Sequence, residues 1–281
     1  MLIERLFQTS IEVMLKPLLS LVLISASACS APVTAPVEFD DLCAFVFEHA
    51  ADEDQEALKL GIVNLQNWLD QNRASVEEGY VVNNLDPNWV EQHEGKAHDL
   101  TDLLGVALAL RYNHNLERVM KRILHDNEEP SFDEEGRITG KRTYNTDHQC
   151  FIEGTCDFVS YDTEAIQNYP LGIEAQVKFH SELRRVQTDV GTAVIARNWM
   201  TAPSDFNWDW ITLDLSYYMG LAIEVEPGVV ERTEATWMLA GFAGAPVSVD
   251  MGLTMALDKM KTNAINFRAG LDAEYADQPS P

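Results

Sequence analysis

The second half of the chain contains segments in which apolar and polar residues alternate, and this two-residue period constrains the fold most. Alternation of this kind is typical of a β-strand with one buried and one wet face. Gly191 and the pair Pro227-Gly228 stand at breaks between segments and favour short turns. Together they predict an antiparallel meander. The alternating segments are 173–183, 191–199, 211–225 and 229–239.

After the last alternating segment the period changes to that of an amphipathic helix. A helix of this length that follows an antiparallel sheet buries its apolar stripe against that sheet. We therefore expect a long C-terminal helix packed on the sheet. The residues of the predicted stripe are Val249, Leu253, Leu257, Met260, Ala264, Phe267, Leu271 and Tyr275.

The first half of the chain has a different pattern. Leucine and isoleucine recur at helical spacing from Asp54 to Asp70, and residues 97–125 repeat that spacing, so 39–127 is predicted to be a helical region. The polar, turn-rich stretch 127–137 is predicted to be a linker. The expected fold class is α+β, with a helical N-terminal part followed, over 138–277, by an antiparallel sheet packed on the long C-terminal helix.

The N-terminus has the layout of a secretion signal. Lys16 precedes an apolar run that is shorter than the roughly 20 residues a membrane-spanning helix needs, and small residues lead up to Cys29. We expect residues 1–28 to be a signal peptide. Residues 29–38, which contain serine, alanine and proline, are expected to form a flexible tether.

This leader resembles that of bacterial lipoproteins. In that family the cysteine that ends the recognition motif is diacylated and becomes the first residue of the mature protein. The resemblance implies lipidation of Cys29 and anchoring of the chain to a membrane of the cell envelope. Ala26 stands where the family prefers leucine, and Ala26-Ser27-Ala28 also suits ordinary signal peptidase. The alternative is a secreted or periplasmic protein without an anchor.

The four cysteines allow two patterns of pairing. Cys150 and Cys156 flank a short loop with a glycine and are expected to form a disulfide in an oxidising compartment. Lipidation of Cys29 leaves Cys43 unpaired. Without lipidation, Cys29 and Cys43 are available to pair with each other.

Charge and missing motifs narrow the function classes. The chain has a formal net charge of -25 and a pI near 4.4, and such a surface repels phosphate backbones, so no nucleic-acid partner is expected. The sequence has no nucleophile elbow, no glycine-rich phosphate loop and no calcium-loop spacing. We therefore assign no catalytic residue and expect no cofactor.

A meander of strands, Trp237 in the last strand, a Gly/Pro-rich turn and a long terminal helix resemble the START-like, helix-grip superfamily over residues 144–275. In that family a curved sheet wraps the C-terminal helix and leaves an apolar cavity, and members bind or carry lipids and other hydrophobic molecules. The family also opens with a strand before its small helices, which we do not identify in 39–140.

The resemblance implies a cavity wall made by inward strand positions and the helix stripe. The alternative is that the same residues fill a solid core, as apolar stripes usually do. The predicted wall residues are Val177, Phe179, Leu213, Leu215, Tyr217, Met219, Trp237, Leu253, Leu257 and Met260.

His93, His98 and Asp102 are candidate metal ligands. His98 and Asp102 share one face of a helix, and His93 on a preceding loop completes a set of three. The two histidines are five residues apart, so they do not form the zinc-protease motif. A polar helix start with surface histidines explains the same pattern.

The leading expectation is a cell-envelope lipoprotein that binds or carries an apolar small molecule or lipid between the sheet and the terminal helix. A second hypothesis is a structural lipoprotein with a solid core and no ligand, whose partner is another envelope protein. A third is a metal-dependent enzyme that uses His93, His98 and Asp102.

Overall fold

The computed structural model describes residues 34–124, 138–169, 172–242 and 249–277. The predicted signal peptide, Cys29, the first part of the tether and the predicted linker lie outside these residues. The described helices are α1 (Phe39–His49), α2 (Glu56–Glu77), α3 (Pro87–Glu94), α4 (Leu116–Ile123), α5 (His148–Ile152) and α6 (Val249–Glu274). The described strands are β1 (Tyr80–Val81), β2 (Leu104–Tyr112), β3 (Ile138–Tyr144), β4 (Phe158–Tyr169), β5 (Ile173–Thr188), β6 (Gly191–Met200), β7 (Asp205–Phe206), β8 (Ile211–Glu226) and β9 (Val229–Phe242).

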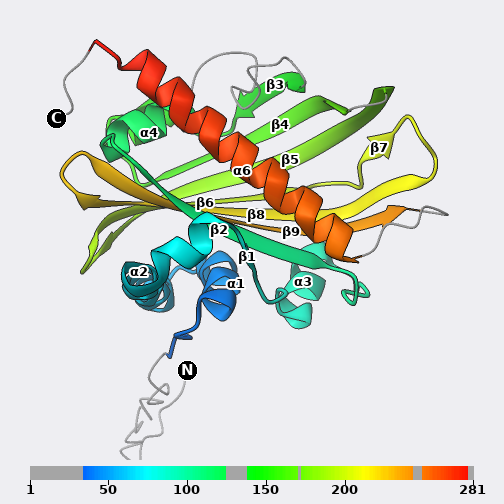
Figure 1. Ribbon diagram of the computed structural model, residues 1–281, viewed down its shortest axis with the longest axis horizontal. Coiled ribbons are helices and arrows are strands. Elements are labelled where there is room, and N and C mark those ends of the chain that lie inside the picture. The colour runs from blue at the N-terminus through cyan, green and yellow to red at the C-terminus, as the bar shows by residue number, and fades with distance from the viewer. Residues whose placement is uncertain (1–33, 125–137, 170–171, 243–248, 278–281) are drawn as a thin grey trace, which may run out of the picture. The chain divides into compact units, whose positions relative to one another are not determined.

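The described strands form one antiparallel sheet in the order β1-β2-β9-β8-β6-β5-β4-β3, with β7 paired to β5. Strands β5, β6, β8 and β9 match the four alternating segments, so the predicted meander is confirmed. Gly191 and Gly228 adopt positive φ angles of 129° and 74° at two of its turns, a conformation that favours glycine. The long helix α6 crosses the sheet diagonally (Figure 1). The fold is α+β with a helix-grip arrangement, as expected.

Residues 104–112 form strand β2, so the expectation of a helical region over 39–127 is wrong in this part. β2 pairs with β9 along its whole length, from Leu104 opposite Met238 to Tyr112 opposite Val230. Most of its residues are buried, and its two faces contact different clusters, so the sequence shows no alternation. An apolar run of this kind is not distinguishable from a buried helix by period alone. β2 is therefore a strand within 39–140 that the sequence pattern does not reveal.

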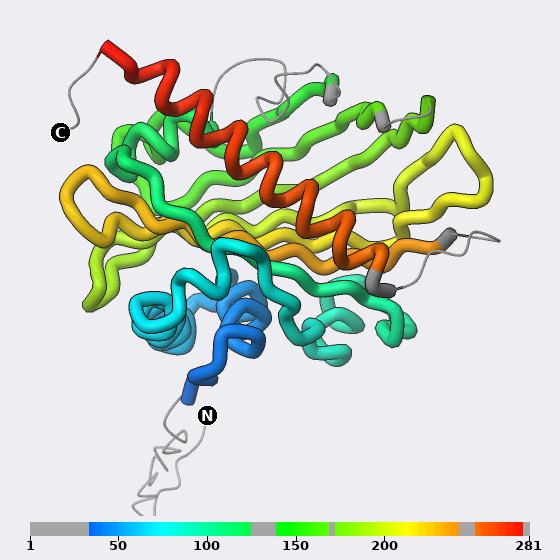
Figure 2. Tube along the Cα trace, in the orientation of Figure 1, coloured from blue at the N-terminus to red at the C-terminus, as the bar shows by residue number. Residues whose placement is uncertain are grey.

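Helices cover both faces of the sheet. On the α1–α3 face, the largest core cluster joins the N-terminal helices to Tyr217, Met219 and Trp237. On the α6 face, Met260 and Ala264 pack with Val106 and Leu108 of β2. Figure 2 shows α6, in orange and red, lying diagonally over the strands, with the blue α1 and α2 below them. Successive residues of β8 and β9 therefore point to two different buried environments.

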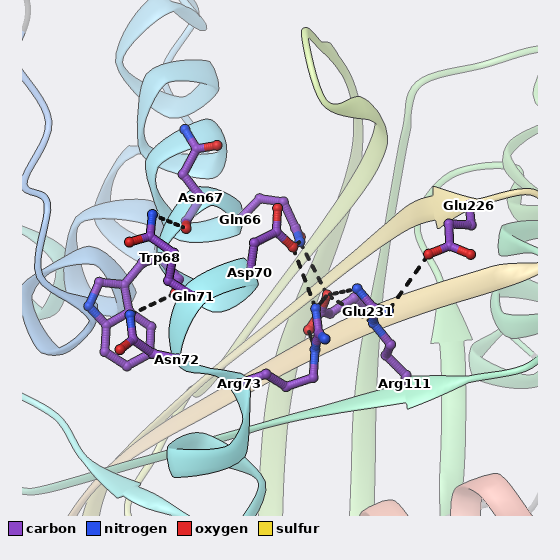
Figure 3. Close-up of polar contacts among 10 residues, drawn as sticks. All are labelled: Gln66, Asn67, Trp68, Asp70, Gln71, Asn72, Arg73, Arg111, Glu226 and Glu231. Carbon is purple, nitrogen blue, oxygen red and sulfur yellow. Dashed lines mark hydrogen bonds and ion pairs between the residues drawn. The ribbon is translucent and has the colours of Figure 1, made fainter.

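A buried ion network joins α2 to strands β2 and β9 of the sheet. The Glu231 carboxylate accepts hydrogen bonds from Arg73 Nε at 2.7 Å, Gln66 Nε2 at 3.1 Å and Arg111 Nη2 at 3.3 Å (Figure 3). Its side chain is 1% exposed. Burial alone would raise the pKa of Glu231, but the hydrogen bonds from Arg73 and Gln66 outweigh burial and lower it. This Glu231 network holds an ionised carboxylate between α2 and β9.

Two cysteines form the expected disulfide. The Cα atoms of Cys150 and Cys156 are 5.4 Å apart, and the bond closes the turn that follows α5. Cys43 is buried in α1 and has no disulfide partner among the described residues, and burial raises the pKa of its thiol. No described helix combines the length and the apolar character needed to cross a bilayer.

Candidate ligand cavity

A cavity of about 260 Å³ lies between α6 and the sheet. Helix α6 contributes Asn263 and Phe267, and α4 contributes Met120 and Ile123. The rest of the lining comes from β3, β4, β5, β6, β8 and β9. The volume lies just below the roughly 300–1,000 Å³ of typical small-molecule sites, so the space suits a small ligand.

Small side chains on two neighbouring strands create this space. Ala196 on β6 is paired with Gly220 on β8, and Val194 is paired with Ala222 in the same register. Ala196, Gly220 and Ala222 all line the cavity and reach only a short way from the sheet toward α6. A Cβ atom at Gly220 would lie 3.0 Å from the Tyr218 hydroxyl, so a larger residue there would crowd the neighbouring side chain.

Much of the lining is apolar. Leu183 and Val194 are each 1% exposed, and Met120 and Phe267 are buried with them in one cluster. Phe179 of β5 also lines the cavity. These side chains offer a hydrocarbon ligand an environment without hydrogen-bonding groups.

The lining includes a buried ion pair. Arg232 Nη2 lies 3.1 Å from Glu234 Oε1 and donates a hydrogen bond of 2.9 Å to the Tyr218 hydroxyl. The Arg232 guanidinium also lies over Phe267, 4.5 Å from the ring centroid. Burial favours the neutral form of arginine, but Glu234 and Tyr218 outweigh burial and raise the pKa of Arg232. Because both charges have partners, this pair is a neutral polar unit within the wall.

A second arginine lines the cavity from β3. Arg142 Nη1 donates hydrogen bonds to the Ile123 carbonyl at 2.9 Å and to the Tyr144 hydroxyl at 3.2 Å. The guanidinium lies 4.3 Å from the ring centroid of Tyr161. Burial opposes its charge, but Tyr161 and Tyr144 outweigh burial, and the pKa of Arg142 is raised. A fixed positive charge therefore lines the cavity beside the last turn of α4.

Of the ten predicted wall residues, Phe179 lines the cavity. Leu215, Tyr217, Met219 and Trp237 lie instead in the core of the α1–α3 face, so their assignment to a wall beneath α6 is wrong. The physical reason is that both faces of β8 and β9 are covered. The odd positions, which are the more apolar, pack against three N-terminal helices in a solid core, and the even positions face α6.

The remaining predicted wall residues have other roles. Leu253, Leu257 and Met260 belong to the stripe that packs α6 on β2, as expected of the helix, but they do not line the cavity. Val177 is 2% exposed in a small cluster with alanines of β4 and β5. Leu213 is half-buried near the start of β8, next to a shift in the β8–β9 register.

Apart from Phe179, the residues that line the cavity are absent from the predicted wall. Tyr218, Gly220 and Ala222 fall on the even positions of β8, which we interpreted as the outer face. Arg232 and Glu234 likewise occupy even positions, on β9, and line the cavity. A usable signal was present: Arg232 and Glu234 carry opposite charges two residues apart on a strand, so they share one face of β9 and can pair there.

The candidate metal ligands do not form a site. Among the described residues, no group of three or more His, Cys, Asp or Glu side chains is placed to hold a metal ion. His93 stacks on Trp89 with the ring centroids 4.8 Å apart, and burial lowers the pKa of His93. His98 is partly buried and Asp102 is exposed.

Comparisons with known proteins found likeness among solved structures. No family model matches the chain. No curated protein sequence matches it either. Among solved structures, the human StarD13 (DLC2) lipid transfer and protein localization domain is similar, with 8% sequence identity and a TM-score of 0.40. That match covers 74% of this chain and 95% of the other chain.

Proposed function

We propose that this protein binds a small apolar or amphipathic molecule in the cavity between α6 and the sheet. The observation that carries the proposal is a space of about 260 Å³ whose lining combines buried apolar side chains, such as Leu183 and Phe267, with polar side chains that include Arg232. Removal of apolar ligand surface from water contributes about 25 cal/mol per Å², before the cost of lost ligand freedom. Helix α6 covers the ligand, and the buried Arg232–Glu234 pair gives the wall a fixed polar group.

A solid core, which the alternative hypothesis without a ligand requires, is present on the opposite face of the sheet, against α1–α3. The α1–α3 face is filled by large side chains such as Phe47, Tyr217 and Trp237, each no more than 1% exposed. The α6 face carries small residues and a cavity instead. The difference between the two faces favours the ligand-binding proposal.

Fluorescence titration with N-phenyl-1-naphthylamine, an uncharged apolar dye, tests the proposal. The purified protein should enhance dye emission in a saturable way. Ala196→Leu should weaken dye binding about tenfold or more because the added side chain fills the space beside Gly220. Asn67→Leu adds the same side chain to an exposed position of α2 and is the matched control. Non-saturable emission, or equal binding by Ala196→Leu, would count against the cavity as the binding site.

We also propose that the protein is exported and anchored through lipidated Cys29. The leader pattern supports export, and the Cys150–Cys156 disulfide is typical of an oxidising compartment. Mass spectrometry of the N-terminal peptide from cells tests this. A diacylglyceryl group on Cys29 is expected. An unmodified Cys29 at the N-terminus would leave a secreted or periplasmic protein, and an intact leader would refute processing.

A further inference from the structure

The cavity contains an uneven distribution of charge. Three arginines contribute to its lining, and two of them have carboxylate partners: Arg232 pairs with Glu234 at 3.1 Å, and Arg197 Nη2 pairs with Glu182 at 2.7 Å. Within residues 34–124, 138–169, 172–242 and 249–277, no carboxylate lies within ion-pair distance of the third arginine, Arg142. In a chain of net charge -25, this unmatched cation at a cavity is unusual.

Hydrogen bonds within the protein occupy one side of the Arg142 guanidinium, and the other side is available to a ligand. Nη1 donates its two hydrogens to the Ile123 carbonyl and the Tyr144 hydroxyl, and the Tyr161 ring lies 4.3 Å from Cζ. In the described part of the chain, Nε and Nη2 donate no hydrogen bond. These two nitrogens form the edge of a guanidinium that donates two parallel hydrogen bonds to a carboxylate or a phosphate.

We propose that the ligand is an anionic amphiphile with a single short hydrocarbon chain, and that Arg142 binds its oxyanion. This inference rests on the proposed function and names the ligand class. The hydrocarbon chain lies against Phe179, Leu183 and Phe267, and the oxyanion accepts hydrogen bonds from Nε and Nη2 of Arg142. The oxyanion supplies the negative charge that the described residues do not. A cavity of about 260 Å³ is too small for a lipid with two long chains.

Displacement of N-phenyl-1-naphthylamine from the purified protein tests the inference with three probes of equal chain length. Dodecanoate carries a carboxylate, dodecyl phosphate carries a phosphate, and 1-dodecanol is neutral. At least one anionic probe should bind about tenfold or more tightly than 1-dodecanol, because hydrogen bonds between charged groups are stronger than neutral ones. The tighter of the two anionic probes indicates whether the oxyanion is a carboxylate or a phosphate.

Substitution of Arg142 assigns the effect to this residue. Arg142→Gln should weaken the anionic probe about tenfold or more and change 1-dodecanol binding less than about twofold. Arg142→Lys keeps the charge without the two parallel donors, so its affinity for the anionic probe should lie between those of the parent and Arg142→Gln. Lys141→Gln removes the same charge from an exposed neighbour on β3 and should bind as the parent does.

The possible outcomes separate the inference from the proposed function. Equal affinity of all three probes in the unaltered chain overturns the anionic inference and leaves a neutral-ligand site, and this comparison does not depend on the folding of any variant. Equal weakening of all probes by Arg142→Gln also overturns it, because the arginine is then only structural. Absence of dye binding in the parent protein refutes the proposed function itself.

Discussion

Replacement of Glu231 by glutamine tests how the structure positions β9. Glu231 and Arg232 are neighbours on this strand, and they point to opposite faces of the sheet: Glu231 accepts hydrogen bonds from α2, and Arg232 lines the cavity. The Glu231 network therefore fixes the strand that carries the Arg232–Glu234 pair of the cavity lining. Glutamine keeps the size of the side chain and removes its charge, so the substitution leaves Arg73 and Arg111 without their shared buried partner.

The expected cost follows from burial. Removal of one partner from a buried ion pair costs about 3–5 kcal/mol. The side chains of Arg73 and Arg111 are 24% and 32% exposed, so both can reach water, and the loss should fall at the lower end, about 3 kcal/mol. At an m value of about 2 kcal/mol per molar urea, this lowers the unfolding midpoint by about 1.5 M.

Urea unfolding followed by tryptophan fluorescence measures this change. Asp70→Asn is the control, because Asp70 lies in the same network but its side chain is 56% exposed, and its loss should cost less than about 1 kcal/mol. Since the pKa of Glu231 is lowered in the folded protein, its contribution is present above the unfolded pKa of about 4.3 and is lost as pH falls through the folded pKa. A loss below about 1 kcal/mol at pH 7 would show instead that desolvation of these groups cancels the gain from their hydrogen bonds.

Four further outcomes are expected. Phe267→Ala should cost about 3 kcal/mol or more in urea unfolding, because this α6 ring is 6% exposed and packs in the cluster between α6, α4 and the sheet. Burial lowers the pKa of His93, so the unfolding free energy should fall as pH drops below about 6.5, and His93→Gln should remove part of that fall. Reduction of the Cys150–Cys156 bond should lower stability by about 2 kcal/mol in thermal unfolding, since the closed loop is short. Ala196→Leu should unfold at a similar or higher urea concentration than the parent, while binding less dye.

The sequence predicted the meander and α6 because each has one clear period. Strand β5 alternates along its length, and the stripe from Leu253 to Phe267 has helical spacing. β2 was missed because burial on both faces removes the alternation from Leu104 to Tyr112. Its place beside β9 depends on a pairing across more than 100 residues, which no local pattern records.

The cavity wall was assigned to the wrong face for a related reason. The odd positions of β8, such as Tyr217 and Met219, are more apolar than the even ones, and we interpreted the more apolar face as the one toward α6. The structure places that face against α1–α3. A binding site needs space and a few polar groups, so its lining includes Gly220 and Arg232 and is less apolar than a solid core.

Nuclear Overhauser contacts between ¹³C-labelled dodecanoate and the protein side chains show whether a small amphiphile lies on the α6 face of the sheet. We predict contacts from the methylene groups to Phe179, Val194 and Phe267, and none to Tyr217 or Trp237. Contacts to Tyr217 or Trp237 instead would place the ligand among α1–α3 and rule out the cavity beneath α6 as its site.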